Sequence, residues 1–181
     1  MIIDHNRRWI GLSPFTFVVG ITLLSGLVDC RCSIADSAKS ESGARRTIDW
    51  VQQEGGPKHD KIRGITVDAA GNCYVTGEFT DEAVFGDRTV SSRGSMDFVL
   101  AKYSPDGKLL WFRTAGGSEI DRGYSVAVDA AGNSYVTGHF QSPEFRIGDK
   151  VFTNRGDYDY FVAKFDAGGE FQWAHSGGGA G

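Results

Sequence analysis

The chain contains a long internal repeat. Residues 68–79, DAAGNCYVTGEF, return as residues 129–140, DAAGNSYVTGHF, with ten of the twelve letters unchanged and the two starts 61 residues apart. One extra residue lies between Phe140 and Gly148, where a loop tolerates an insertion, and beyond it the offset is 62. Self-similarity at such a period predicts a tandem array of one supersecondary unit rather than two unrelated halves.

Each unit holds four runs that are typical of β-strands and are separated by turn residues. In the second unit these runs are residues 124–129, 134–140, 160–165 and 170–176. Glycine and asparagine in the turns supply the positive φ angles of tight hairpins, and a longer polar loop is expected between the second and third runs. Beyond the N-terminal segment no stretch shows a sustained helical period, so the predicted fold class is all-β.

Several of the runs are apolar at successive positions, as in Phe98-Val99-Leu100-Ala101. A strand that is apolar on both sides is covered on both faces of its sheet. Four-stranded antiparallel sheets of about 60 residues that stack face to face are the blades of a β-propeller. We therefore expect about two such blades, preceded by one extra strand over about residues 48–54.

Two kinds of residue have predicted places between and within the blades. Trp111 and Trp173 recur at the same position of the repeat, and each is expected to fill the gap between neighbouring blades. Gly77 and Gly138 lie inside strands and are expected to mark a bulge or a close backbone approach.

The order of the motifs resembles a known repeat family. The pattern D-A-A-G-N-x-Y-V-T-G-x-F, then D-x-F-V-A-K-Y/F-x-x-x-G, then W and GG, resembles the SBBP-type β-propeller repeats of bacterial secreted and cell-surface proteins. The resemblance covers about residues 48–179 and implies a propeller blade but no single activity. Unit 1 would span about residues 50–110, unit 2 about 111–172, and a third would start at 173–181.

The N-terminal segment has the features of an export signal. Arg7 and Arg8 precede an uncharged stretch, residues 9–28, and the sequence then becomes polar. We interpret residues 1–35 as a signal peptide, cleaved after Ala35, and residues 36–47 as a linker. The apolar run is also long enough to serve as an uncleaved membrane anchor. Either way the chain is expected to be exported, to the periplasm, the cell surface or the medium, with the membrane contacted only through this segment.

Charge and cysteine content exclude several classes of function. The formal net charge is -4, so no basic surface favours a nucleic acid as partner. With the leader removed Cys73 is the one cysteine left, and Ser134 holds its place in the second unit, which favours packing over nucleophilic chemistry. A single cysteine and scattered histidines build no metal site. We expect no catalytic residues, no metal and no cofactor.

The candidate ligand-binding residues lie in the connections that lead from one blade to the next: His59, Asp60, Glu119 and Asp121. The competing interpretation is that Asp60 and Asp121 cap the following strands through backbone amides. The Asp-Ala-Ala-Gly-Asn turns are likewise interpreted as hairpins braced by aspartate rather than calcium loops. Two pairs differ between the units, Glu78 with His139 and Arg63 with Tyr124, as is common at surface positions.

The number of units decides how the chain is expected to work. Closed propellers have typically four to eight blades, so two units do not close a ring alone. The sequence is either part of a longer reading frame, which its SGGGAG ending favours, or a subunit of a ring closed between copies. The predicted function is a non-catalytic interaction or scaffold module at the cell envelope, with a protein or glycan as partner. The alternative is a fragment of an envelope enzyme or carbohydrate-binding propeller with its active residues in other blades.

Overall fold

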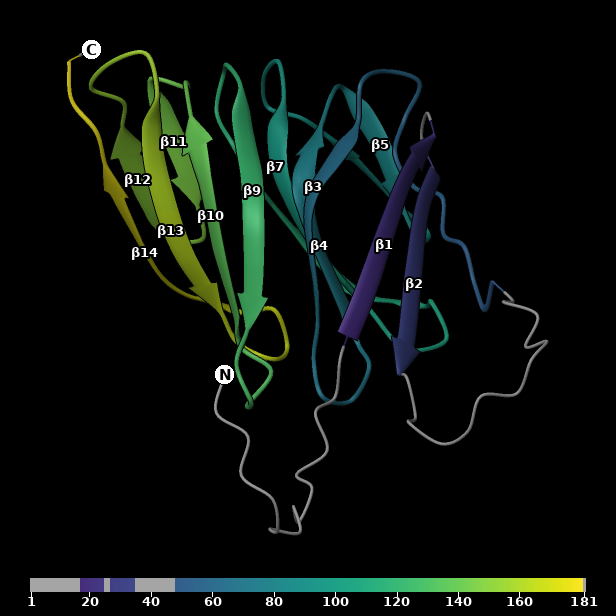
Figure 1. Ribbon diagram of the computed structural model, residues 1–181. Coiled ribbons are helices and arrows are strands. Elements are labelled where there is room, and N and C mark those ends of the chain that lie inside the picture. The colour runs from purple at the N-terminus through teal and green to yellow at the C-terminus, as the bar shows by residue number, and fades with distance from the viewer. Residues whose placement is uncertain (1–16, 25–26, 35–47, 181) are drawn as a thin grey trace, which may run out of the picture.

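Two four-stranded antiparallel sheets form the body of the computed structural model, which describes residues 17–24, 27–34 and 48–180 (Figure 1). The first sheet has the order β3-β4-β7-β8 and the second β9-β10-β13-β14. Their strands are β3 (Lys61–Val67), β4 (Cys73–Phe79), β7 (Asp97–Tyr103), β8 (Leu109–Ala115), β9 (Asp121–Val128), β10 (Ser134–Phe140), β13 (Asp159–Phe165) and β14 (Phe171–Gly177). No helix occurs in the described residues, and the all-β, four-stranded prediction is confirmed.

The stretch between the second and third strand of each sheet is a hairpin, and the prediction of a polar loop there was wrong. The first hairpin is β5 (Glu82–Phe85) with β6 (Arg88–Ser91), and the second is β11 (Glu144–Ile147) with β12 (Lys150–Thr153). Exposed and buried residues alternate along β5 and β11, so each hairpin covers apolar surface with every second residue. The inserted residue lies between β10 and β11, in a connection, as expected.

The segment before the first sheet is extended but is not a full strand. It joins β5 through one isolated antiparallel bridge, Gly55 with Val84, where an extra strand was expected over about residues 48–54. Trp50 anchors the segment because its indole Nε1 donates to the carbonyl oxygen of Pro105 at 3.0 Å and its ring stacks on Tyr103. The segment therefore covers the outer side of the first sheet.

The predicted leader and linker fall mainly outside the described residues. Within residues 1–47 the structure describes β1 (Phe17–Leu24) and β2 (Leu27–Ile34), which pair antiparallel from Phe17 with Ile34 to Leu24 with Leu27. In the described part of the chain no helix is long and apolar enough to cross a membrane. Export, cleavage and anchoring remain predictions from the sequence.

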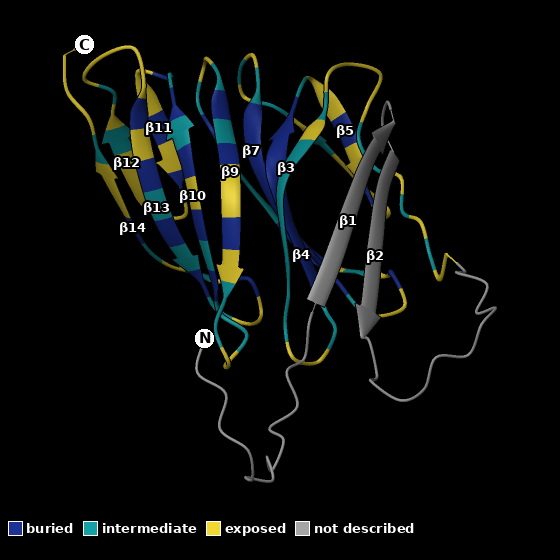
Figure 2. Ribbon diagram, viewed as in Figure 1, coloured by how far each residue is buried: buried dark blue, intermediate teal, exposed yellow. Residues whose placement is uncertain are grey.

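The two sheets pack face to face, and their contact covers only one side of the second sheet. A continuous apolar core joins Tyr74, Phe98 and Leu100 of the first sheet to Phe140 and Phe161 of the second. All seven residues of β4 and of β7 are buried, whereas β10 and β13 alternate between buried and more exposed positions (Figure 2). The expectation that each sheet is covered on both faces holds for the first sheet and for one face of the second.

Gly77 and Gly138 lie opposite a β-bulge, as expected. The pairing of β3 with β4 skips Arg63, and the pairing of β9 with β10 skips Tyr124 at the equivalent position. A Cβ at Gly77 would overlap the carbonyl oxygen of Lys61, and one at Gly138 the carbonyl oxygen of Arg122. The absence of a side chain lets the bulged strand come close, and the bulge leaves Arg63 and Tyr124 without a paired residue on the neighbouring strand.

This close approach predicts that one added methyl group at Gly138 lowers the stability of the fold. Gly138→Ala should lower the free energy of unfolding by about 2 kcal/mol or more, because the new Cβ pushes β9 and β10 apart. Gly179→Ala is the control, since nothing lies within 4 Å of the position of its Cβ. Urea unfolding curves of the two variants measure the difference, and equal stability would contradict the bulge geometry.

Candidate functional site

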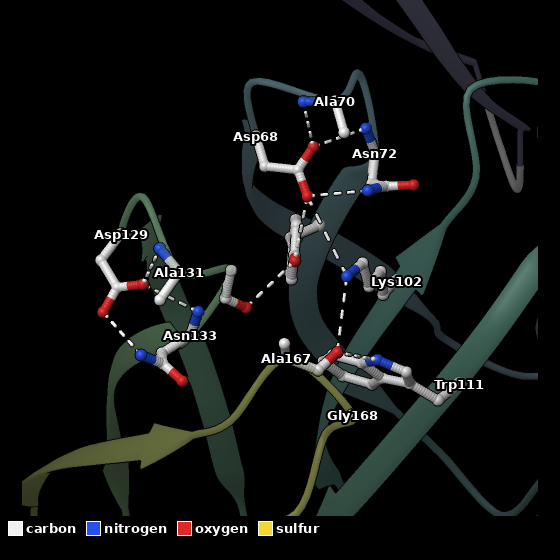
Figure 3. Close-up of polar contacts among 12 residues, drawn as sticks. Asp68, Ala70, Asn72, Lys102, Trp111, Asp129, Ala131, Asn133, Ala167 and Gly168 are labelled. Atoms are coloured by element: carbon white, nitrogen blue, oxygen red, sulfur yellow. Dashed lines mark hydrogen bonds and ion pairs between the residues drawn. The ribbon is translucent and has the colours of Figure 1, made fainter.

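The turns that begin the second strand of each sheet are braced by an aspartate. In the first turn Asp68 Oδ1 accepts hydrogen bonds from the backbone amides of Ala70 (3.0 Å) and Asn72 (2.9 Å), and its Oδ2 accepts one from Asn72 Nδ2 at 2.8 Å (Figure 3). Asp129 makes the same three bonds in the second turn. These bonds lower the pKa of both carboxyls against the effect of burial. The geometry is that of a self-braced hairpin.

A tyrosine ties the first turn to the second. The hydroxyl of Tyr74 lies 3.2 Å from Asp68 Oδ2 and 3.2 Å from the carbonyl oxygen of Gly132, which belongs to the turn between β9 and β10. Burial and the nearby carboxylate of Asp68 raise the pKa of the Tyr74 hydroxyl. The phenol therefore stays protonated near neutral pH and remains a donor between the two units.

A second polar contact joins the sheets at the carbonyl of Ala167. This oxygen accepts from the indole Nε1 of Trp111 at 3.1 Å and from Lys102 Nζ at 3.4 Å (Figure 3). The Trp111 ring meets Tyr74 edge-on, and a Cβ at Gly169 would lie 2.7 Å from the indole. Trp111 closes the gap between the blades, as expected, and Gly169 makes room for it.

The middle of the contact is apolar and tightly fitted. The ring of Phe98 packs edge-on against Phe161 with 5.5 Å between centroids. A side chain at Gly123 of β9 would overlap both Phe98 and the hydroxyl of Thr76, so the strand approaches closely only because this residue is glycine. We call this whole contact between the two sheets, from the turns to the inner strands, the seam.

At the bulged end of β3 the seam carries a buried charge cluster. Glu78 is 1 % exposed, and its carboxylate accepts from Arg63 Nε at 2.6 Å and Nη2 at 2.7 Å. Arg122 Nε of the second sheet lies 3.8 Å from the same carboxylate, and His59 Nε2 lies 3.9 Å away. The guanidinium of Arg63 also stacks 4.9 Å over the ring of Tyr124. An unpaired buried charge is costly. The buried carboxylate of Glu78 on the first sheet therefore favours a packing in which Arg122 of the second sheet stays close to it.

This cluster was not predicted from the sequence. Its members differ between the repeats, Glu78 against His139 and Arg63 against Tyr124, and this divergence suggested surface positions. Glu78 is buried instead because the second sheet covers it. Such a difference at an otherwise repeated position was the available signal, since it marks where the two units have different neighbours.

Of the four predicted ligand-binding residues, Asp60 and Asp121 occupy equivalent places in the repeat, and His59 and Glu119 lie close to them in the sequence. Asp60 accepts from the amides of Gly56 (2.6 Å) and Thr80 (3.1 Å), so it braces the entry to β3. His59 is exposed, and with Asp60 it lines an open polar hollow of about 570 Å³ beside the leading segment. These contacts fit a bracing role for Asp60, and ligand binding at this hollow stays a prediction.

In the second connection the aspartate is more deeply placed. Asp121 is fully buried and accepts from the amide of Gly117 (2.7 Å) and from Ser142 Oγ (2.6 Å). Glu119 exposes its side chain, while its amide donates to Ser142 Oγ at 2.9 Å. The structure thus gives Asp121 a capping role, and Glu119 is the member of this pair that solvent reaches.

The second sheet carries a copy of the seam on its other side, where no further sheet lies in the described chain. The hydroxyl of Tyr135 is 3.1 Å from Asp129 Oδ2, Lys164 Nζ lies 5.1 Å over the Tyr135 ring, and Trp173 packs beside that ring. Tyr160 is 61 % exposed, whereas its counterpart Phe98 is 0 % exposed. We call this surface the open face; it consists of Tyr135, His139, Tyr160, Val162, Lys164 and Trp173.

The comparisons with known proteins agree with this architecture. Residues 49–78 and 110–139 each match the family model of the SBBP β-propeller repeat. The chain is also 31 % identical over 124 residues to the regulatory protein FlaEY of Caulobacter vibrioides, a match that covers 65 % of this chain and 13 % of that protein. The chain therefore spans a small part of this relative's length.

The buried carboxyl of Asp97 predicts a pH dependence of stability. Burial raises its pKa from 3.8 to about 6, and the carboxylate of Asp121 adds to the rise. The folded chain holds this proton more tightly than the unfolded chain, so the free energy of unfolding should fall as the pH rises from about 4 to about 6, by at most about 3 kcal/mol. Urea unfolding across this range measures the slope, and Asp97→Asn should remove most of it. A free energy that rises across the range would contradict the assignment.

The two equivalent tryptophans predict unequal effects of one substitution. Trp111→Ala removes a buried indole from the seam and should cost about 3–5 kcal/mol of unfolding free energy. Trp173→Ala should cost under about 2 kcal/mol, because the open face leaves its ring partly in water. Denaturant unfolding of both variants checks the pair, each serving as the control of the other. Equal losses would mean that the two faces are equally covered.

Proposed function

We propose that this chain, an SBBP-type β-propeller repeat protein, is a non-catalytic interaction or scaffold module that works at the cell envelope. The open face is the observation that carries the proposal. Its side chains occupy the repeat positions whose counterparts on the first sheet pack against a neighbouring sheet in the seam, and on the second sheet these positions face no further sheet of the described chain. An apolar and aromatic surface with a polar border is the composition of a protein-binding surface.

The use of the acidic side chains supports a non-catalytic role. Asp60 and Asp121 accept hydrogen bonds from backbone amides, and Glu78 is held by two bonds from Arg63. A general base or nucleophile needs a lone pair that faces substrate, and these oxygens face the chain's own amide or guanidinium groups. Bracing of turns and strands accounts for their recurrence in both units.

The place of action rests on the sequence and on the relative. Arg7, Arg8 and the uncharged stretch after them have the pattern of an export signal. The relative from Caulobacter vibrioides is named a regulatory protein, a name that fits an interaction role better than a metabolic reaction. Protein is the partner class that the open face favours, since sheet packing needs a large flat apolar counterpart.

Fractionation combined with cross-linking tests this function. The full chain, with an epitope tag at its C-terminus, is produced in a Gram-negative bacterium with a photo-reactive phenylalanine at Tyr160 or, as control, at Leu110. Leu110 is 51 % exposed but lies on β8 of the first sheet, away from the open face. We expect the chain in the periplasmic, membrane or secreted fraction, with discrete protein adducts from position 160 alone.

Two results would contradict the proposal. Retention of the chain in the cytosol, with its leader intact, would remove the envelope role. Adducts that are equal at positions 160 and 110 would remove the open face as the binding surface. Binding of a glycan at the hollow beside His59 and Asp60, without any protein adduct, would favour the carbohydrate-binding alternative.

A further inference from the structure

We infer that the open face is a socket for one kind of partner: a further four-stranded sheet of the same repeat type that carries glycine at the position of Gly123. The inference deepens the proposed function and rests on it for the biological setting. It also states that the first sheet of a second copy of this chain is not that partner. Each part follows from contacts that the seam already displays.

The turn contacts of the open face are prepared in the same way as those of the seam. In the seam, Tyr74 reaches the carbonyl of Gly132 and Trp111 reaches that of Ala167, both in the following unit. On the open face Tyr135 is already bonded to Asp129 at 3.1 Å, as Tyr74 is to Asp68. Two turn carbonyls of a following repeat are therefore the groups that would complete this surface.

The lysine over the tyrosine ring is also repeated on the open face. Lys102 lies 4.8 Å over the Tyr74 ring and bonds the carbonyl of Ala167, and Lys164 lies 5.1 Å over the Tyr135 ring. A cation over an aromatic ring is held in place before any partner arrives. Lys164 and Trp173 occupy the repeat positions from which Lys102 and Trp111 donate to the carbonyl of Ala167.

The first sheet of another copy fails as a partner at the turn. Trp50 of the leading segment already donates to the carbonyl of Pro105 at 3.0 Å, the position that corresponds to Ala167. Its indole lies 2.7 Å from the position of a Cβ on Gly107, as that of Trp111 does at Gly169. Trp173 of a neighbouring copy would need this same place, so the chain's own leading segment blocks it.

The first sheet also fails in the middle of the contact. Ile62 pairs with Gly77, and Gly123 pairs with Gly138, so Ile62 occupies the place of Gly123 in the repeat. Since even a Cβ at Gly123 would overlap the side chains across the seam, an isoleucine at this place keeps the sheet away from Thr137 and Tyr160. A partner sheet must therefore carry glycine at the position of Gly123.

The inner strand sets the approach of the partner. A Cβ at Gly64 would lie 2.8 Å from the carbonyl oxygen of Tyr124, and Ser125 holds the position of Gly64 in the second unit. A third sheet therefore sits a few tenths of an ångström farther out at this end than the second sheet does. Trp111 lies on β8, at the opposite edge of the sheet from Gly64 on β3, so the tryptophan contact is unaffected.

The test adds a repeat to the full chain. A second copy of residues 118–177 is attached after Gly179, and this copy carries Tyr160→Phe and Trp173→Phe so that its peptides differ in mass from the originals. Hydroxyl-radical labelling with mass spectrometry then reads the original Tyr160 and Trp173. Docking should lower the labelling of Tyr160 about fivefold or more, since its exposed fraction of 61 % would approach the 0 % of Phe98.

Matched controls isolate the glycine. The same extended chain with Gly123→Ile in the added copy should leave the labelling of Tyr160 unchanged. An added copy of residues 57–115 should also leave it unchanged, and Ile62→Gly in that copy should restore protection. Unchanged labelling with the glycine-bearing copy, or equal protection by all copies, would overturn the inference.

Self-association is tested on the unmodified full chain by sedimentation velocity over a concentration series. A monomer throughout is the expected result, and a dimer or ring that Tyr160→Asp abolishes would overturn the exclusion of a second copy. These experiments use purified protein, so their outcome does not depend on export. Failure of docking with envelope cross-links from Tyr160 intact would leave the proposed function standing with a different partner class.

Discussion

The structure depends on burying sheets that are apolar on both faces. The first sheet succeeds, because the leading segment and the first hairpin cover one side and the second sheet covers the other. The polar contacts of the seam determine which face of the next sheet packs here, since the phenol of Tyr74 and the indole of Trp111 each donate to a carbonyl of the following unit. Apolar burial supplies most of the free energy, and these two donors set which sheet follows which.

The repeated residues have structural duties, and the divergent residues have local ones. Asp68 and Asp129 brace their own turns, and Asp60 and Asp121 brace their own strand entries, each through backbone amides. The Glu78 cluster is built from residues that the second unit does not repeat, because Glu78 lies 3.8 Å from Arg122 across the seam. Residues repeated in both units of this chain therefore serve packing. Positions at which the units differ mark places where one unit has a neighbour that the other lacks.

Much of this could be predicted from the sequence, because the decisive contacts are local or repeated. Runs of successive apolar residues, turn glycines and the recurring tryptophan predicted the strands, the four-stranded sheets and the place of Trp111. The β5–β6 and β11–β12 hairpins were missed, since runs of only four residues in which every second one is exposed resemble loops. Burial of Glu78 was missed because its partner Arg122 is 44 positions away in the other unit. The similar sequences of β4 and β10 also do not reveal that β4 is covered on both faces and β10 on one.

The seam itself is open to one direct measurement, nuclear Overhauser contacts in the NMR spectrum of the full chain between the Trp111 indole and Gly169. The account predicts strong contacts, with the Gly169 α-protons shifted upfield by the ring that lies against them. The absence of these contacts, together with independent tumbling of residues 61–115 and 121–177, would show two separate sheets and contradict the claim that one unit is built to receive the next.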